Sequence, residues 1–249
     1  MKNIIIVTGG AGFVGSNLVD RLSKIKKYQI YSLDNYSAGT KKNHIKKKNV
    51  IYIKGNTKNI EKYFKNKIKK IKTIFHFGEF SRIYQSFINF DKCMDSNLIG
   101  TKAVFNFCLK YKIKLIYSAT SASIGNNGED KNLSPYAFSK AKNLEFLENL
   151  KRWFNFKYEV IFFYNVYGPK QICEGSMATV IGIFEKKYLQ KKPLPVVRPG
   201  TQSRRFTHIN DTIDVCFKAW KKNKCRYYSI SNRESFSILE VAKLFNSKI

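Results

Sequence analysis

Tyr136 and Lys140 stand four residues apart, a spacing that places both side chains on one face of a helix. Pro135, directly before Tyr136, is typical of the start of a helix. A tyrosine phenol, with an ordinary pKa near ~10, is a poor base at neutral pH, but a neighbouring ammonium lowers that pKa. Such a pair can take a proton from a hydroxyl while hydride leaves the same carbon. The spacing alone also fits an ordinary helix surface.

A glycine-rich turn close to the N-terminus has the pattern of a phosphate-binding loop. Gly10, Gly12 and Gly15 satisfy G-x-G-x-x-G, and Gly9, Gly12 and Gly15 satisfy G-x-x-G-x-x-G. Glycine permits positive φ and lets a pyrophosphate approach the backbone. The helix that follows offers free N–H groups and a positive dipole end to phosphates. The alternative is a glycine-rich turn that serves only the backbone.

Asp34 ends the next apolar run, where an acid can accept hydrogen bonds from the ribose hydroxyls of adenosine. Its carboxylate would repel a 2′-phosphate, which favours NAD over NADP. Asp34 could instead only form the turn over residues 34–37. The agreement of strand, glycine turn, helix and acid predicts a dinucleotide-binding unit.

Short apolar runs alternate with longer amphipathic segments through the first part of the chain. We expect buried strands at residues 4–7, 30–33, 50–53, 74–77, 115–117 and 160–163, and helices at residues 14–24, 97–111 and 137–154. This alternation predicts an α/β fold, a Rossmann-like doubly wound parallel sheet with helices on both faces. After Gly168 the pattern loosens, so we expect an NAD-binding Rossmann domain at 1–165 and a smaller substrate-binding region at 166–249.

The expected strand at 115–117 leads into a cluster of hydroxyl side chains between Ser118 and Ser123. Open α/β sheets bind ligands beyond the carboxyl ends of their parallel strands. The Tyr136–Lys140 pair follows one element later, in a chain that opens with a phosphate-binding turn, and this position strengthens the catalytic interpretation. A serine-rich loop without a chemical role is the alternative.

The composition is globular but strongly basic, with 46 Lys and Arg against 17 Asp and Glu in 249 residues, a net charge of +29. Such a charge can indicate a nucleic-acid partner. However, Lys, Asn, Ile, Phe and Tyr all have AT-rich codons, so codon bias also explains it, and we expect no nucleic-acid partner. The five cysteines are widely spaced without C-x-x-C, and no metal site is expected. The N-terminal apolar run is too short for a membrane span or signal peptide, so we expect a cytoplasmic protein.

Together these features resemble the extended short-chain dehydrogenase/reductases, specifically the NAD-dependent epimerase/dehydratase family. Four further stretches carry the resemblance: FHFG at 75–78, NLIGT at 97–101, YNVYGP at 164–169 and GTQSRRFTH at 200–208. The resemblance covers nearly the whole chain. It implies NAD as the cofactor, a nucleotide sugar as the substrate and a homodimer formed through the helices at 97–111 and 137–154.

Carried over by motif, the resemblance makes Tyr136 the acid/base, with Lys140 supporting it and the nicotinamide ribose, while Thr120 bonds a sugar hydroxyl. The implied cofactor contacts are Gly9, Gly12, Phe13, Val14, Gly15, Asp34, Asn35, Asn56, Phe77, Gly78, Asn97, Ser118, Tyr136, Lys140 and Phe163. The implied substrate contacts are Ser86, Thr120, Asn165 and Arg204.

The chain departs from the family pattern at several positions. Asn56 stands in place of an adenine-contacting Asp, and Glu79 stands where a small residue is usual. Arg205 replaces an Asp, and Ile124 replaces a common Tyr. Family members usually continue beyond Ile249, so we expect the region at 166–249 to be incomplete relative to the family.

The residues after Thr120 bear on the reaction. In 4,6-dehydratases of the family an Asp-Glu pair follows this Thr, whereas Ser121 and Ala122 follow here. We therefore expect an NAD-dependent nucleotide-sugar epimerase, acting at C4 of a UDP-hexose or UDP-N-acetylhexosamine in polysaccharide synthesis. The alternatives are a dehydratase, decarboxylase or reductase of the same family, and a non-catalytic binding protein on a Rossmann scaffold.

Overall fold

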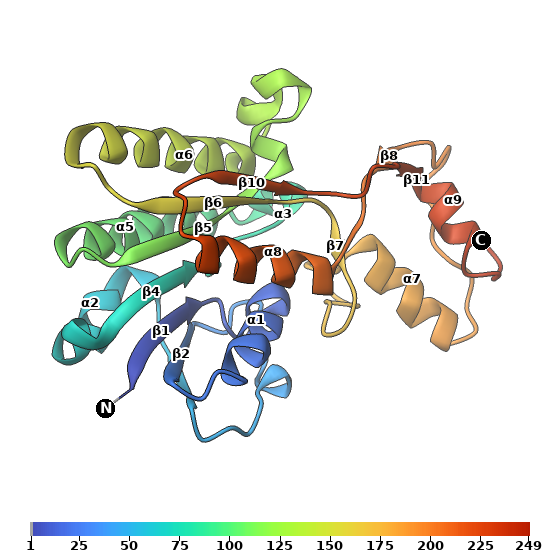
Figure 1. The fold of residues 1–249 in the computed structure, drawn as a ribbon. Helices are drawn as coiled ribbons and strands as arrows, with labels where there is room; N and C mark the ends of the chain where they lie inside the picture. Colours follow the sequence, from blue (N-terminus) through green and yellow to red (C-terminus); the bar gives the residue numbers. More distant parts are fainter. Residues whose placement is uncertain (1) are drawn as a thin grey trace.

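The computed structural model describes residues 2–249, and its centre is a seven-stranded parallel sheet in the order β10-β6-β5-β4-β1-β2-β3 (Figure 1). The strands are β1 (Asn3–Thr8), β2 (Tyr28–Asp34), β3 (Val50–Lys54), β4 (Ile71–His76), β5 (Lys114–Thr120), β6 (Tyr158–Phe163) and β10 (Tyr227–Ile230). The winding reverses between β1 and β4, and ligands bind beyond the carboxyl ends of strands at such a switch point.

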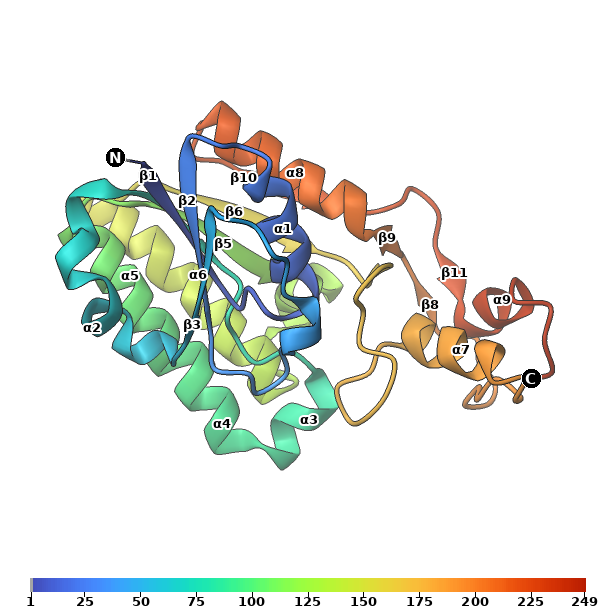
Figure 2. The same ribbon diagram turned by 90° about the horizontal axis from the view of Figure 1, so that it is seen from below.

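Alternate residues of the central strands face opposite layers of helices, as the period of two requires. In β1, Ile4 and Ile6 belong to one core, and Ile5 and Val7 belong to the other. Figure 2 shows the two layers on opposite sides of the sheet. One layer holds α1 (Phe13–Ser23) and α8 (Ile209–Lys222), and the other holds α2 (Ile60–Phe64), α5 (Thr101–Lys110) and α6 (Pro135–Phe154).

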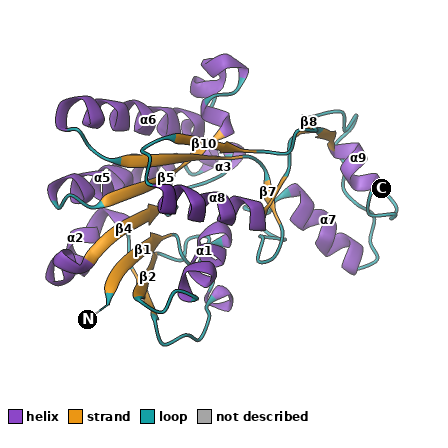
Figure 3. Cartoon of the chain, in the orientation of Figure 1, coloured by secondary structure: helices purple, strands orange, loops and turns teal. Residues whose placement is uncertain are grey.

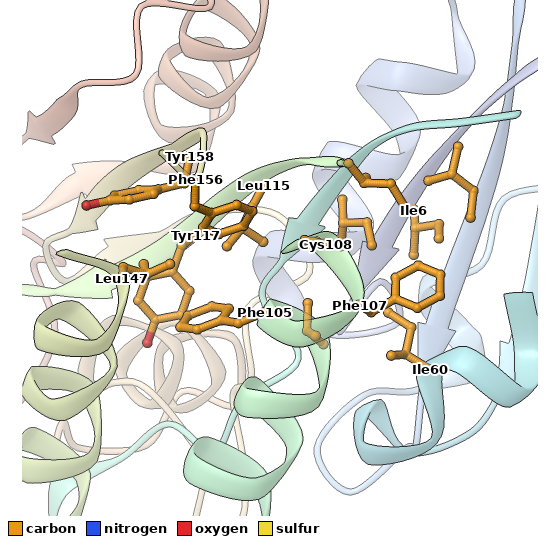
Figure 4. Close-up of a cluster of buried hydrophobic side chains, with 14 of the residues drawn as sticks. Ile6, Ile60, Phe105, Phe107, Cys108, Leu115, Tyr117, Leu147, Phe156 and Tyr158 are labelled. Carbon is orange, nitrogen blue, oxygen red and sulfur yellow. The ribbon is translucent and has the colours of Figure 1, made fainter. Parts of the chain in front are cut away.

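The core under α5 and α6 contains a large polar-tipped side chain, Tyr117 of β5. Its ring is fully buried and packs edge-on against Phe105 with a centroid separation of 5.4 Å (Figure 4). A buried tyrosine requires a partner for its hydroxyl. The hydroxyl of Tyr117 reaches the carboxyl-end edge of the sheet, where it becomes part of the site described below.

From residue 166 on, the chain apart from α8 and β10 forms a smaller body beyond the carboxyl ends of the strands, best seen beside the sheet in Figure 3. Its own core contains Phe184, Leu194 and Phe206. It comprises α7 (Val180–Leu189), α9 (Ile238–Lys243), the antiparallel pair β8 (Ser203–Arg204) and β11 (Phe236–Ser237), and the parallel pair β7 (Val166–Tyr167) and β9 (Thr207–His208). None of the helices within residues 2–249 has the length and apolar character needed to cross a bilayer.

The sheet contains all six strands that the sequence predicts, but it also has a seventh. β10 lies after residue 166 and pairs with β6, and α8 packs against the sheet through Trp220, whose indole N–H donates to Thr73 Oγ1 at 3.1 Å. Residue 166 therefore separates the strands β1–β6 from a segment that partly returns to the same sheet.

The helix expected at 97–111 is present, but it begins in the π-helical turn η4 (Asp95–Gly100) and continues as α5. Two short helices that the sequence did not predict, α3 (Ile83–Ile88) and α4 (Phe90–Met94), precede it. The remaining short helices are the 3-10 turns η1 (Lys41–Asn43), η2 (Thr57–Asn59), η3 (Lys65–Lys70), η5 (Ser121–Ser123) and η6 (Asn126–Asn132). The π-helical turn contains Asn97, whose side-chain amide forms hydrogen bonds with the backbone of Phe80, outside the helix.

Candidate active site

A cavity of about 960 Å³ lies at the carboxyl ends of the central strands, with walls from both the sheet and the smaller body. Most residues that the sequence singled out line it. They are Gly9, Gly12, Phe13, Val14, Gly15, Asp34, Asn35, Phe77, Gly78, Ser118, Thr120, Tyr136, Lys140, Phe163, Asn165 and Arg204. Residues more than 190 positions apart in the chain therefore share one binding space.

The glycine turn after β1 brings the backbone close to the cavity and to the next strand. Gly9 has φ +68°, and a Cβ on it would lie 2.7 Å from the carbonyl oxygen of Phe77. A Cβ on Gly15 would lie 2.1 Å from the carbonyl oxygen of Gly9. Gly12, with φ −77°, precedes α1 and has no side chain to cover the first N–H groups of the helix. The turn therefore fits a dinucleotide pyrophosphate.

The sequence argument for positive φ applies to one cradle glycine. Within the described residues 9–15, Gly9 alone has a φ in the left-handed region. Gly10 and Gly15 are required because a Cβ would collide with the Ser32 side chain or the Gly9 backbone. Gly10 and Gly15 are thus required because there is no room for a side chain, and not because of their backbone conformation.

Asp34 at the end of β2 is held at the cavity wall by two backbone donors. Its Oδ2 accepts from the Ala11 N–H at 2.9 Å, and its Oδ1 accepts from the Tyr36 N–H at 2.7 Å. A carboxylate offers about four acceptor positions, so it can still accept hydrogen bonds from ribose hydroxyls. Asn35 lines the same wall while its side chain accepts from the Ser37 N–H at 3.0 Å.

Tyr136 lies in the first turn of α6, and its backbone is fixed from two directions. Ser134 caps the helix by accepting from the Ala137 N–H at 3.1 Å. Ser86 on α3 accepts from the Tyr136 N–H at 3.2 Å and donates to the Ile83 carbonyl at 2.6 Å. Ser86 is fully buried and is absent from the cavity wall within the described residues. It therefore contacts the tyrosine backbone, and the structure does not bring it to the wall as a substrate contact.

The Lys140 ammonium is almost completely buried, and its partners come from β5 and from the loop after β4. It donates to the Ser118 carbonyl at 2.5 Å and forms an ion pair with Glu79. The Tyr117 hydroxyl is a longer contact at 3.4 Å. Thr120, at the end of β5, lines the same cavity, and its Oγ1 accepts from the Ala122 N–H at 3.3 Å.

A buried chain of hydrogen bonds connects the glycine turn with this ion pair. Thr8 Oγ1 accepts from two backbone N–H groups that follow β4, so its hydroxyl donates to His76 Nδ1 at 2.7 Å. The His76 Nε2–H then donates to Thr101 Oγ1 at 2.9 Å, and the Thr101 hydroxyl donates to Glu79 Oε1 at 3.0 Å. Burial lowers the pKa of His76 to about 4, which agrees with this neutral tautomer.

Two expected cofactor contacts have their side chains engaged elsewhere. The Asn97 amide accepts from the Phe80 N–H at 2.6 Å and donates to the Phe80 carbonyl at 3.1 Å. The Asn56 side chain caps η2 by accepting from the Lys58 N–H at 3.0 Å. Neither residue is among the described residues of the cavity wall. Asn97 instead fixes the loop that carries the cavity residues after β4.

Arg82 is a cavity residue that the sequence did not indicate. Its guanidinium donates to the Met177 carbonyl through Nε at 3.0 Å and through Nη2 at 2.8 Å, and its backbone has φ +146°. Burial lowers its pKa. It joins the loop before α3 to the smaller body. This link connects segments 95 residues apart, so no local pattern indicates it.

The wall from the smaller body carries polar groups that suit a charged ligand. Arg204 is exposed on β8, and Asn165 adopts φ +34° while donating to the Arg205 carbonyl at 3.0 Å. Among residues 2–249, no three His, Cys, Asp or Glu side chains are grouped so that they could hold a metal ion. The cavity thus combines a phosphate cradle, a buried lysine and a tyrosine with an arginine from the smaller body.

Comparison with known proteins shows the family of this chain. The model of the NAD dependent epimerase/dehydratase family matches residues 5–230. A putative UDP-glucose 4-epimerase of Methanocaldococcus jannaschii is 30% identical over 230 residues, covering 88% of this chain and 74% of that protein. An ADP-L-glycero-D-manno-heptose-6-epimerase of Brachyspira hyodysenteriae is 31% identical over 257 residues, covering 96% of this chain and 79% of that protein.

A solved structure has the same fold. The UDP-glucose 4-epimerase of Thermotoga maritima, crystallised with UDP-glucose, superposes with a TM-score of 0.89 at 26% identity, covering 98% of this chain and 81% of that one. Together with the family match, this confirms the extended short-chain dehydrogenase/reductase resemblance and the Rossmann-like fold. The chain belongs to the NAD dependent epimerase/dehydratase family, and its cofactor is NAD.

Proposed function

We propose that this protein is an NAD-dependent nucleotide-sugar epimerase that inverts C4 of a UDP-hexose or UDP-N-acetylhexosamine through a transient 4-keto sugar. One observation carries the proposal: Thr120, Tyr136 and Lys140 face the same cavity as the glycine turn and Asp34. A binding module on this scaffold has no need of that catalytic set. The UDP-glucose 4-epimerase relatives support the substrate class.

In this reaction Tyr136 takes the proton from the C4 hydroxyl and later returns it, while the Thr120 hydroxyl orients the sugar. When bound, NAD would supply the redox chemistry of hydride removal and return. Lys140 would hold the nicotinamide ribose and contribute positive charge to the cavity that the phenol also lines. Inversion requires the keto sugar to rotate within the cavity before it is reduced, so that hydride returns to its other face.

The residues that follow Thr120 favour epimerisation over dehydration. Elimination of water from a sugar requires an acid and a base near the carbons concerned. Ser121 and Ala122, which line the cavity directly after Thr120, supply neither. Oxidation and reduction at a single carbon need only the groups already present on the wall.

The wall from the smaller body suits the nucleotide diphosphate. Arg204 can form charge-assisted hydrogen bonds with phosphate oxygens. Asn165, beside it on the wall, can bond the sugar. Substitution of Arg204 by Gln should raise the KM for the nucleotide sugar with little change in NAD content, because the arginine belongs to β8 of the smaller body and not to the glycine turn.

We also propose that the protein forms a homodimer through the helices expected from the sequence, at 97–111 and 137–154, with α3 and α4 extending the same interface. Large apolar side chains gather there without cover. Those more than half exposed are Ile83, Tyr84, Phe87, Ile88, Phe90 and Ile99. Exposed apolar clusters of this kind mark association surfaces. Light scattering coupled to gel filtration tests this, and a monomer at micromolar concentration would contradict it.

The test of the proposed reaction is incubation with NAD and a panel of UDP-sugars, with the products resolved by NMR. Interconversion of a 4-epimer pair is expected, and a 4-keto-6-deoxy product would identify a dehydratase instead. The matched control is Tyr136→Phe, which should keep NAD binding and lose turnover. Full activity in that variant would refute the assignment of Tyr136. Absence of both conversion and NAD binding would favour the non-catalytic alternative.

A further inference from the structure

We propose that Glu79 is a positioning residue that holds the Lys140 ammonium in an ion pair and thereby sets the pH range in which Tyr136 works. The inference rests on the proposed role of Tyr136 as the acid/base group. Glu79 follows β4, in the loop that Asn97 fixes. Glu79 lines the cavity, but both of its carboxylate oxygens accept from protein donors, so its role runs through Lys140.

The Glu79 carboxylate is built into the protein by donors from three separate elements. Oε1 accepts from the Thr101 hydroxyl at 3.0 Å, the Tyr117 hydroxyl at 3.0 Å and the Asn143 amide at 3.2 Å. Oε2 accepts from the Lys140 ammonium. Its side chain is only 3% exposed, and a buried carboxylate is tolerated only with such a complete set of partners.

The same contacts determine where the lysine can point. An ammonium has three N–H donors. In this structure two are directed at Glu79 and the Ser118 carbonyl, and the third has only the 3.4 Å contact with the Tyr117 hydroxyl. This third donor is the one that can turn to the cofactor ribose without breaking the ion pair. Glu79 therefore fixes the lysine in the orientation that faces the cavity.

The carboxylate is also the anion that balances the charge of the lysine. The titratable groups packed around the pair are His76 on β4, Cys93 on α4 and Tyr117 on β5. Burial lowers the pKa of His76 to about 4, raises the pKa of the Cys93 thiol and raises the pKa of Tyr117 well above its usual value. All three are uncharged at neutral pH, so they cannot replace the charge of Glu79.

Arg82 is a second cation on the wall of the cavity that Tyr136 and Lys140 line. Without Glu79, two cations would share this wall with the Tyr136 phenol, and no buried anion would offset Lys140. Positive charge favours the ionised phenol. Removing the carboxylate should let Tyr136 ionise at lower pH. The rising limb of the plot of activity against pH should therefore also move to lower pH.

The variant is Glu79→Gln, which keeps the size and removes the charge. The matched control is Glu159→Gln, because Glu159 forms another buried ion pair, with Lys114, at the opposite end of β5 and β6. The rising limb of kcat against pH should move down by about one pH unit in Glu79→Gln and stay in place in Glu159→Gln.

A second measurement is independent of turnover. The side chain of Tyr136 is titrated by ¹³C NMR without sugar, and its resonance is identified by its loss in Tyr136→Phe. The same downward movement should appear there, even if no tested nucleotide sugar is converted. If the protein converts no tested sugar but the titration of Tyr136 still moves to lower pH in Glu79→Gln, the proposed reaction is refuted and the role of Glu79 is kept.

An unchanged Tyr136 titration in a folded Glu79→Gln protein overturns the proposal. Glu79→Ala, which introduces a small residue, is prepared in parallel in case the glutamine variant does not fold. If neither variant folds or retains NAD while Glu159→Gln does both, Glu79 has a structural role only, and the proposal is likewise overturned.

Discussion

Substitution of Gly15 by Ala tests how closely the phosphate cradle is packed. The added Cβ would lie 2.1 Å from the Gly9 carbonyl oxygen and 2.9 Å from the Gly10 Cα. Both neighbours are backbone, so relief requires the glycine turn and the start of α1 to separate. Overpacking of this kind costs ~1–3 kcal/mol. At ~2–4 °C per kcal/mol for a chain of this size, Tm should fall by about 2–12 °C.

The same separation moves the first N–H groups of α1 away from the pyrophosphate. We therefore expect NAD affinity to fall at least tenfold, which corresponds to ~1.4 kcal/mol. Thermal unfolding without ligand measures the first effect, and calorimetric titration with NAD measures the second. Both are performed on the same protein preparation after removal of bound nucleotide.

Two other glycines separate the possible causes. A Cβ on Gly12 meets only the Gly9 carbonyl oxygen, at 3.2 Å, so Gly12→Ala should weaken NAD binding with a smaller loss of stability. Gly175 has φ +76° but no neighbour within 4 Å, so Gly175→Ala should lose ~1–2 kcal/mol from backbone strain and leave NAD binding unchanged. Wild-type Tm and NAD affinity in Gly15→Ala would refute the packing argument.

Three further predictions concern the polar groups of the site. His76 is neutral in the folded protein because its pKa is lowered to about 4. The unfolded chain therefore binds more protons between pH 4 and about 6.5, and the free energy of unfolding should fall by up to ~3 kcal/mol as the pH drops through this window. Equal urea midpoints at pH 4.5 and 7 would contradict this prediction. Ser86→Ala should lower kcat and leave NAD content unchanged, because it frees the Tyr136 N–H; an unaltered kcat would remove the positioning role of Ser86. Asp34→Asn should reduce the preference for NAD over NADP, measured as the ratio of their Kd values, and a constant ratio would count against the ribose contact.

Local patterns were sufficient for the central strands and for the start of the site. The apolar runs of β1 to β6 and the glycine turn depend on residues that are neighbours in the chain. The spacing of Tyr136 and Lys140 is a local property too, because α6 has a proline at its start and a serine cap. In contrast, β10 is a short edge strand with alternately exposed residues, and its sequence lacks the apolar run of a buried strand.

Other features appeared only when distant segments were brought together. Asn97 had the residue type of a polar contact, but its partner is the Phe80 backbone, and the helix around it becomes a π-helical turn. Arg82 carries no local signal because its acceptor is the Met177 carbonyl. Hydrogen bonds are satisfied by whatever group lies within ~3 Å, irrespective of position in the chain.

The sequence by itself determined the fold class, the cofactor-binding turn and the Tyr136–Lys140 pair, because each depends on the type and order of nearby residues. It also marked Glu79 as unusual, without indicating what the residue does. The tertiary structure decided that point, since the partners of Glu79 stand 22 to 64 residues further along the chain. The pairing of buried charges is governed by distance and by the low local dielectric constant, and both are properties of the folded molecule.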